Sequence, residues 1–328
     1  MKMKIAICIT VFLLGMVVPG VVASIAIPDW EETTAPPETS VSVTTIPETT
    51  HETANEFTVP ILMDDGMIHE MTLDEYITGV VLREMPASFE LEALKAQAVV
   101  ARTYTLKQLN IGKKHPGCAV CTDSNCCQGY YKLDAYLSAG GSQADVEKIR
   151  QAVSDTQDLV LIYENELIDA TYFSCSGGKT EDAVSVWGAQ VPYLQSVESP
   201  GEQNSVHYID TVSFSAAEFE SLLGSKLQGE PEQWFGSVTY TAGGGVATIE
   251  IADKLYEGVT LRRLLGLKST AFAITAVGST VTITTKGFGH RVGMSQYGAD
   301  AMALNGATYP DILAHYYPGT QLRTLNNN

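Results

Sequence analysis

The sequence predicts an α+β domain that follows an amino-terminal membrane segment. Helical patterns of apolar residues lie on both sides of Pro86, and three hairpin patterns follow them along the chain. Helices at the start and hairpins afterwards are typical of α+β proteins. With 328 residues, 45% of them hydrophobic, the chain is long enough for one large domain or two small ones.

The amino terminus predicts a membrane anchor. Lys2 and Lys4 precede an uncharged, mostly apolar run from Ile5 to Pro28, which as a helix would cross about 30 Å of hydrocarbon. The positive flank would stay in the cytoplasm, so the rest of the chain would lie outside. A cleaved signal peptide, cut near "VVAS", is the alternative. Because the apolar run continues to Ile27, we favour a retained anchor over 1–29 and a single-pass protein of the cell membrane.

The next segment, 30–56, is rich in Thr, Glu and Pro and nearly free of large apolar side chains. Such a composition predicts an extended tether rather than a packed element.

The formal net charge of the whole chain is −18, from 38 acidic and 20 basic residues. This acidity argues against nucleic acid as a partner.

The globular part is expected over 57–322, with a short tail at 323–328. The stretch "FTVPILMDDGMIHEMTLDEYITGVVLREM" predicts a strand, a turn at Asp65-Gly66, a second strand and a helix that begins after Thr72 and ends before Pro86. A second helix is predicted to begin near Ser88, because Leu91, Leu94, Ala98 and Ala101 recur at helical spacing.

Three later stretches predict antiparallel hairpins. They contain β-branched and aromatic runs interrupted by Glu-Asn, Gly-Gly and Gly-Ser turns. The stretches are "DLVLIYENELIDATYFSCS", "GSVTYTAGGGVATIEIA" and "AFAITAVGSTVTITTKGFGH".

Glu84 is a candidate general acid because it stands in the last turn of the first predicted helix. The unpaired carbonyls at a helix end disfavour a charged carboxylate, and partial burial would raise its pKa further. A protonated carboxyl can donate to the leaving oxygen of a glycosidic bond. The alternative is a solvated acid that ends a helix.

Arg102 lies on nearly the same helical face as Leu91. An arginine on an apolar face is expected to have an anionic partner or to line a cleft. The alternative is that its guanidinium reaches water.

The stretch "HPGCAVCTDSNCC" predicts a metal site. It holds His115, Cys118, Cys121, Cys126 and Cys127, and a cluster this dense with C-x2-C spacing suits tetrahedral zinc. Disulfide bonds are the alternative, since an extracytoplasmic location permits them. Our preferred ligands are His115, Cys121, Cys126 and Cys127, with Cys118 either free or exchanging with Cys121.

Two glycine-rich loops are further candidates for ligand contact. "TYFSCSGGKTED" contains Ser176 and Lys179, and "KGFGHRVGMSQYGADAMALNG" contains His290, Gln296 and Tyr297. Either loop could be only a tight turn. A Cys175–His290 nucleophile and base is a further hypothesis, but no spacing establishes their contact.

Four stretches together resemble the stage II sporulation protein D family, SpoIID, which includes the amidase enhancers. They are "YITGVVLREMPASFELEALKAQAVVARTY", "TYFSCSGGKTEDAVSVWG", "PYLQSVESP" and "GFGHRVGMSQYGADAMA", and the resemblance covers roughly Val59 to Leu322. It implies a membrane-anchored lytic transglycosylase that cuts peptidoglycan strands stripped of their stem peptides, during engulfment in endospore formation. It implies Glu84 as the catalytic acid and Arg102 as the arginine needed with it.

From the resemblance and the loops we expect Arg102, Ser176, Lys179, His290, Gln296 and Tyr297 to contact the glycan. The resemblance also implies zinc in the loop 115–127, and a fully ligated zinc would be structural, because it leaves no open position for substrate. The expected partners are glycan strands and a peptidoglycan amidase. The alternative function is a binding module that stimulates such an amidase, with Trp187, Tyr193 and Tyr297 stacking on sugars.

Overall fold

The computed structural model describes residues 57–112 and 114–325. Their buried apolar side chains form two separate hydrophobic cores. Among these residues, no helix combines the length and the apolar character needed to span a membrane. The predicted anchor and tether, 1–29 and 30–56, lie outside the described residues.

The first core begins with the predicted strand, turn, strand and helix. Strand β1 (Thr58–Leu62) pairs antiparallel with β2 (Ile68–Thr72). Helix α1 (Leu73–Glu84) follows, and the Thr72 hydroxyl accepts a hydrogen bond from the Glu75 N–H, as its predicted role as cap requires. The helix ends where expected, because Pro86 cannot continue it.

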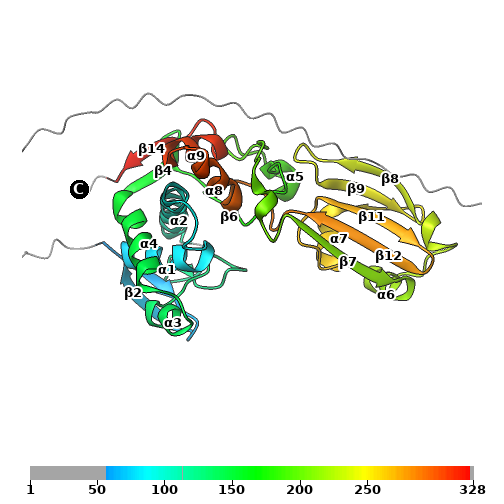
Figure 1. Cartoon of the computed structure of the whole chain (residues 1–328), viewed down its shortest axis with the longest axis horizontal. Coiled ribbons are helices and arrows are strands. Elements are labelled where there is room, and N and C mark those ends of the chain that lie inside the picture. The colour runs from blue at the N-terminus through cyan, green and yellow to red at the C-terminus, as the bar shows by residue number, and fades with distance from the viewer. Residues whose placement is uncertain (1–56, 113, 326–328) are drawn as a thin grey trace, which may run out of the picture. The chain divides into compact units, whose positions relative to one another are not determined.

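Helix α2 (Leu91–Ile111) is the central element of this core (Figure 1). It packs against α1, α4 (Gln143–Asp155), α8 (Gln296–Leu304), α9 (Tyr309–Tyr316) and strand β4 (Leu159–Tyr163). It begins three residues later than the predicted start near Ser88. Residues 86–89 instead close a turn through the hydrogen bond from Phe89 N–H to the Pro86 carbonyl. The Glu90 N–H then donates to Asp300 of α8, which fixes the start of the helix.

Short elements surround α2. Two small sheets have the strand orders β2-β1-β3 and β14-β4-β5, and β6 pairs parallel with β13. The last strand continues to Thr324, two residues beyond the predicted domain end, because it pairs with β4 as far as Leu159. The remaining elements of the first core are β3 (Val120–Cys121), α3 (Leu133–Ser138), α4 (Gln143–Asp155), β4 (Leu159–Tyr163), β5 (Glu166–Leu167), β6 (Tyr172–Phe173), α5 (Ala183–Trp187), the 3₁₀ helix η1 (Glu202–Asn204), β13 (Met294–Ser295), α8 (Gln296–Leu304), α9 (Tyr309–Tyr316) and β14 (Gln321–Thr324).

The second core lies between two three-stranded antiparallel sheets with the orders β10-β9-β8 and β11-β12-β7. Its helices pack against these sheets (Figure 1). Its elements are β7 (Ile209–Ser215), α6 (Ala216–Leu223), the 3₁₀ helix η2 (Pro231–Gln233), β8 (Phe235–Tyr240), β9 (Val246–Ile251), β10 (Lys254–Glu257), α7 (Gly258–Leu264), β11 (Phe272–Val277) and β12 (Thr280–Lys286).

The α+β class and all three predicted hairpins are confirmed: β4–β5, β8–β9 and β11–β12. In the first of them Glu164 and Asn165 have φ values of 50° and 65°, as a two-residue hairpin turn requires. The sequence pattern did not indicate the parallel pairs β1–β3 and β6–β13. These contacts join short strands that lie far apart in the chain.

A buried ion pair helps to join the two cores. Arg291 Nη1 lies 3.2 Å from Glu181 Oε1, and Arg291 Nη2 donates to the carbonyl of Gly243 in the β8–β9 hairpin at 2.8 Å. The same Glu181 oxygen accepts from the N–H of Gly245 at 3.0 Å. Side chains of the first core thus satisfy backbone groups of a hairpin that belongs to the second.

Candidate active site

Glu84 is the last residue of α1, where the chain turns toward Pro86. Its carboxylate oxygen Oε1 accepts a hydrogen bond of 2.6 Å from the backbone N–H of Gly129. Burial raises the pKa of the carboxyl. The Gly129 N–H, the Tyr172 hydroxyl, the Arg83 charge and the Gln296 amide each oppose this shift, but the net pKa stays raised. Glu84 therefore keeps its proton to a higher pH than an ordinary glutamate.

Two pockets meet at Glu84, with volumes of about 370 and 330 Å³. Three residues line both pockets: Glu84, Ser174 and Gln296. Glu84 is therefore accessible from two neighbouring open spaces. The larger pocket is lined also by Tyr104, Tyr172, Phe173, Phe288 and His290, and the smaller by Arg83, Phe89, His207 and Tyr297.

Three of the predicted substrate-contact residues line these pockets. Gln296 and Tyr297 open helix α8, Gln296 lines both pockets together with Glu84, and its Nε2 donates to Gln97 Oε1 at 3.5 Å. His290 lies against Phe173 and Trp187, and its Nδ1 accepts from the Val292 N–H at 3.1 Å. Burial lowers the pKa of His290 to about 4, so the imidazole is neutral near pH 7.

The structure does not bring the other three to the pockets. Arg102 is fully buried, and its guanidinium donates to the carbonyls of Thr156 and Val153 at the end of α4, with Asp74 at 3.4 Å. Ser176 is also fully buried, and Lys179 pairs with Glu198 at 3.1 Å. Arg102 and Ser176 line neither pocket and their polar groups face the interior, so direct glycan contact by them stays a prediction. The idea that the Arg102 guanidinium reaches water is wrong for the same reason.

Cys175 and His290 do not form a nucleophile and base. The Cys175 thiol is fully buried and lies 3.1 Å from a carboxylate oxygen of Glu202, to which it donates. Burial raises the pKa of Cys175 to about 12, which disfavours the thiolate.

Several pocket residues had no signal in the sequence. Phe288 precedes the singled-out His290, and Tyr104 and His207 were not singled out at all; His207 comes from a loop. Arg83 directly precedes Glu84 and is exposed in the smaller pocket. Its position beside a candidate acid was the one available indication.

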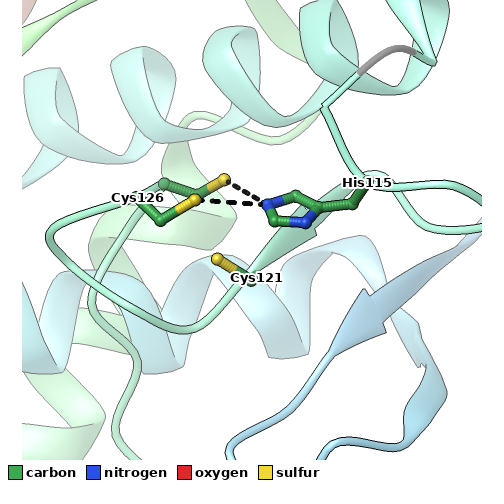
Figure 2. A group of neighbouring side chains, drawn as sticks. His115, Cys121 and Cys126 are labelled. Atoms are coloured by element: carbon green, nitrogen blue, oxygen red, sulfur yellow. Dashed lines mark hydrogen bonds between the residues drawn. The ribbon is translucent and has the colours of Figure 1, made fainter.

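The four preferred metal ligands lie together. One ligand atom each from His115, Cys121, Cys126 and Cys127 lies within 4.8 Å of the other three, and the sulfurs of Cys126 and Cys127 are each 3.4 Å from Nε2 of His115 (Figure 2). Cys118 stands outside this group, and the five described cysteines form no disulfide. Ligands about 2.0–2.3 Å from a tetrahedral zinc would be roughly 3.5–3.8 Å apart. The donor set and its spacing therefore fit zinc.

The cysteine loop is also a wall of the larger pocket. Ser124, Asn125, Cys126, Cys127 and Gln128 line that pocket. The next residue, Gly129, donates to Glu84. A group that holds this loop would consequently hold the hydrogen-bond donor of the candidate acid.

Comparisons with known proteins identify the family of this chain. The profile of the Stage II sporulation protein family, SpoIID, matches residues 64–163. Stage II sporulation protein D of Bacillus subtilis (strain 168) is 42% identical over 260 residues, which cover 78% of this chain and 75% of that protein. The protein of the same name from Bacillus amyloliquefaciens is also 42% identical over 260 residues.

A relative with a different name is the Amidase enhancer of Bacillus subtilis (strain 168). It is 30% identical over 299 residues, which cover 75% of this chain but 40% of that longer protein. The identity and the coverage of the two Bacillus proteins, together with the matching profile, establish that this chain belongs to the SpoIID family of sporulation proteins.

Proposed function

We propose that this protein is a lytic transglycosylase that cleaves stripped peptidoglycan strands between N-acetylmuramic acid and N-acetylglucosamine during engulfment. The observation that supports this proposal best is Glu84, a carboxyl with a raised pKa between two pockets. Membership of the SpoIID family is consistent with it.

In the proposed reaction the Glu84 carboxyl protonates the oxygen that joins the two sugars, and the bond from that oxygen to muramoyl C1 breaks. The C6 hydroxyl oxygen of the muramoyl residue then attacks C1, and the resulting Glu84 carboxylate takes the proton of this hydroxyl. No water is consumed, and Glu84 ends protonated as it began. Because the nucleophile is part of the substrate, the ring closure gains the effective molarity of an intramolecular step, and no second carboxylate is needed.

The two pockets beside Glu84 together form a groove, and the residues that line this groove suit a glycan strand. Aromatic side chains line both pockets and can stack on sugar rings. Among the residues that line the two pockets, Arg83 is the one Lys or Arg. A strand without stem peptides carries a free lactyl carboxylate on each muramoyl residue, and Arg83 could pair with one of them.

The test is product analysis with a matched control. We expect Glu84→Gln to reduce the 1,6-anhydro-muramoyl product from stripped strands by about 10²- to 10⁴-fold, as for loss of a general acid. Glu75→Gln changes an exposed acid in the first turn of the same helix and should leave the product yield unchanged. Mass spectrometry of the digests measures both. Equal product from Glu84→Gln and the unchanged protein would refute the assignment of Glu84.

A second candidate function is stimulation of a peptidoglycan amidase without catalysis. The similarity to the Amidase enhancer favours it, and Trp187 is half-exposed beside His290, where it could bind glycan. Tyr193 is less suited, because it is buried and its hydroxyl accepts from the Asp169 N–H. If this function is correct, added protein should increase stem-peptide release by the amidase, and Glu84→Gln should stimulate it equally well.

We further propose that zinc bound by His115, Cys121, Cys126 and Cys127 has a structural role. Four protein ligands leave no open position, so the ion would hold the cysteine loop rather than take part in the reaction.

We also propose that Ile5–Ile27 remains in the mature protein and anchors it in the cell membrane, with the globular part on the outer face. A native protein that begins near Ser24 and leaves the membrane in a salt wash would show instead that this segment is a cleaved signal.

A further inference from the structure

Glu202 is a buried carboxylate at which three segments of the chain meet. It belongs to the short helix η1, and 1% of its surface is exposed. Oε2 accepts hydrogen bonds from the Cys175 thiol at 3.1 Å and from the N–H groups of Ser176 and Gly177 at 2.8 and 2.9 Å. Oε1 accepts from the hydroxyls of Ser176, Ser199 and Ser295 at 2.9, 2.6 and 2.6 Å.

All six contacts are hydrogen-bond donors, so they suit an ionised carboxylate that acts only as an acceptor. The hydroxyls are oriented in turn. Ser176 Oγ accepts from the Gly178 N–H, and Ser295 Oγ accepts from the Gly298 N–H. Both serines therefore donate to Glu202 and use a lone pair to hold the local backbone; for Ser295 the carboxylate oxygen, at 2.6 Å, is a nearer acceptor than the Ser174 carbonyl, at 3.5 Å.

Two of the three segments continue into the groove. Ser295 is the cap of helix α8, and the next residues, Gln296 and Tyr297, line the pockets. On the other segment Ser174 precedes Cys175 and lines both pockets, and its carbonyl accepts from the Tyr297 N–H. The third segment, with Ser199, does not line either pocket.

The first turn of α8 is built to approach this carboxylate closely. A Cβ on Gly298 would lie 2.8 Å from Glu202 Oε1, 2.2 Å from Ser199 Oγ and 2.1 Å from the Tyr316 hydroxyl. Such distances leave no space for a side chain at this position. The helix start is thus held against the Glu202 carboxylate and has little freedom to shift.

We propose that Glu202 is a positioning residue for the reaction proposed above: it fixes Ser174 and the start of α8, so that Ser174 and Gln296 keep their places beside Glu84 in the two pockets. Glu202 touches neither the pockets nor Glu84, so it acts through Ser295 and Ser174. This inference rests on the proposed function. A purely structural Glu202 would instead support stability through all of its donors alike.

The serines provide the test, because Ser295→Ala and Ser199→Ala each remove one hydroxyl from the same carboxylate oxygen. Ser295→Ala should lower kcat of the folded protein roughly ten- to hundredfold, as a misplaced catalytic group does. Ser199→Ala should leave kcat unchanged, although both variants lose stability. Glu202→Gln should resemble Ser295→Ala, since an amide nitrogen cannot accept from the donors on its side, and combining it with Ser295→Ala should add little.

The pH profile separates positioning from general weakening of the fold. The Gln296 amide lowers the pKa of Glu84, so displacing Gln296 should raise that pKa. The alkaline limb of kcat/KM should then move to higher pH in Ser295→Ala and Glu202→Gln and stay in place in Ser199→Ala. Equal losses of kcat in the two serine variants, or an unshifted limb in both, would overturn the proposal. If Glu202→Gln does not fold, the comparison of Ser295→Ala with Ser199→Ala is sufficient for the test.

Hydrogen exchange keeps this test separate from the proposed reaction. Mass spectrometry should show faster amide exchange over 172–178 and 294–299 in Ser295→Ala than in Ser199→Ala, with α1 unchanged in both. If the unchanged protein yields no anhydro product, the proposed function fails, but this exchange difference still reports whether Glu202 orders the groove. Equal exchange in the two variants would overturn the inference even for an active enzyme.

Discussion

At the residue scale, the pKa of the candidate acid, Glu84, is affected by the hydrogen bond from Gly129. A Cβ on this residue would lie 2.6 Å from Cγ of Arg83 and 2.9 Å from Oε1 of Glu84. In Gly129→Ala both neighbouring side chains must shift, and we expect the Glu84 carboxylate to lose the 2.6 Å hydrogen bond from this N–H. That bond lowers the pKa of Glu84. The pKa should therefore rise, and the alkaline limb of kcat/KM should move to higher pH.

The expected activity of Gly129→Ala below that limb is about 10²-fold lower, because the carboxyl is also displaced from the groove. Steady-state rates between pH 5 and 9 would measure both effects. A variant with the rate and the pH profile of the unchanged protein would show that the Gly129 contact has no role in the reaction.

The buried contacts of Arg102 indicate a role in the stability of the fold. Its guanidinium is enclosed and satisfies the carbonyls at the end of α4, while its Nε has no partner among the described residues. We expect Arg102→Met to lower the free energy of unfolding by about 3–5 kcal/mol, because buried carbonyls lose their donors. Arg150→Met removes an exposed arginine of α4 and should change the free energy of unfolding by less than about 0.5 kcal/mol. Urea denaturation measures both, and a stable but inactive Arg102→Met would show that Arg102 acts in catalysis.

At the element scale, the local signals in the sequence predicted the elements well. Helix α1 has its cap and its proline stop within the same segment, and each hairpin has its turn residues between two strand patterns. The groove was only partly predictable, because it is assembled from distant segments. Glu84, Tyr172 and Gln296 stand in recognisable motifs, whereas His207 reaches the pockets through tertiary packing that no local pattern indicates.

The cysteine loop should depend on its metal. Protein purified under reducing conditions without chelator is expected to contain one zinc per chain, and chelation should lower its melting temperature. Cys127→Ser should lose the zinc and the stability that comes with it, whereas Cys118→Ser should keep the zinc, since Cys118 lies outside the ligand group. Elemental analysis and thermal unfolding measure these changes. Native protein with no zinc and with disulfide-bonded cysteines would show that the loop is held covalently.

At the scale of the whole molecule, the sequence predicted one globular part over 57–322, and the structure shows two hydrophobic cores within it. The second is built from elements between Ile209 and Lys286. Hairpin patterns look alike wherever they pack, so they could not indicate that two of the three belong to a core of their own. The distinction depends on which apolar faces meet, and only the structure shows this.

Cooperation between the two cores should depend on the pair Arg291–Glu181. Both side chains are almost completely buried, and each also bonds to the β8–β9 hairpin. Either single change, Arg291→Met or Glu181→Gln, removes one partner and leaves polar groups unpaired, so each should destabilise the protein by about 3–5 kcal/mol. The double variant leaves no unpaired charge and should lose clearly less than the two single losses combined. Urea denaturation followed by fluorescence of Trp234 in the second core would measure this, and strictly additive losses would show that the ion pair does not couple the cores.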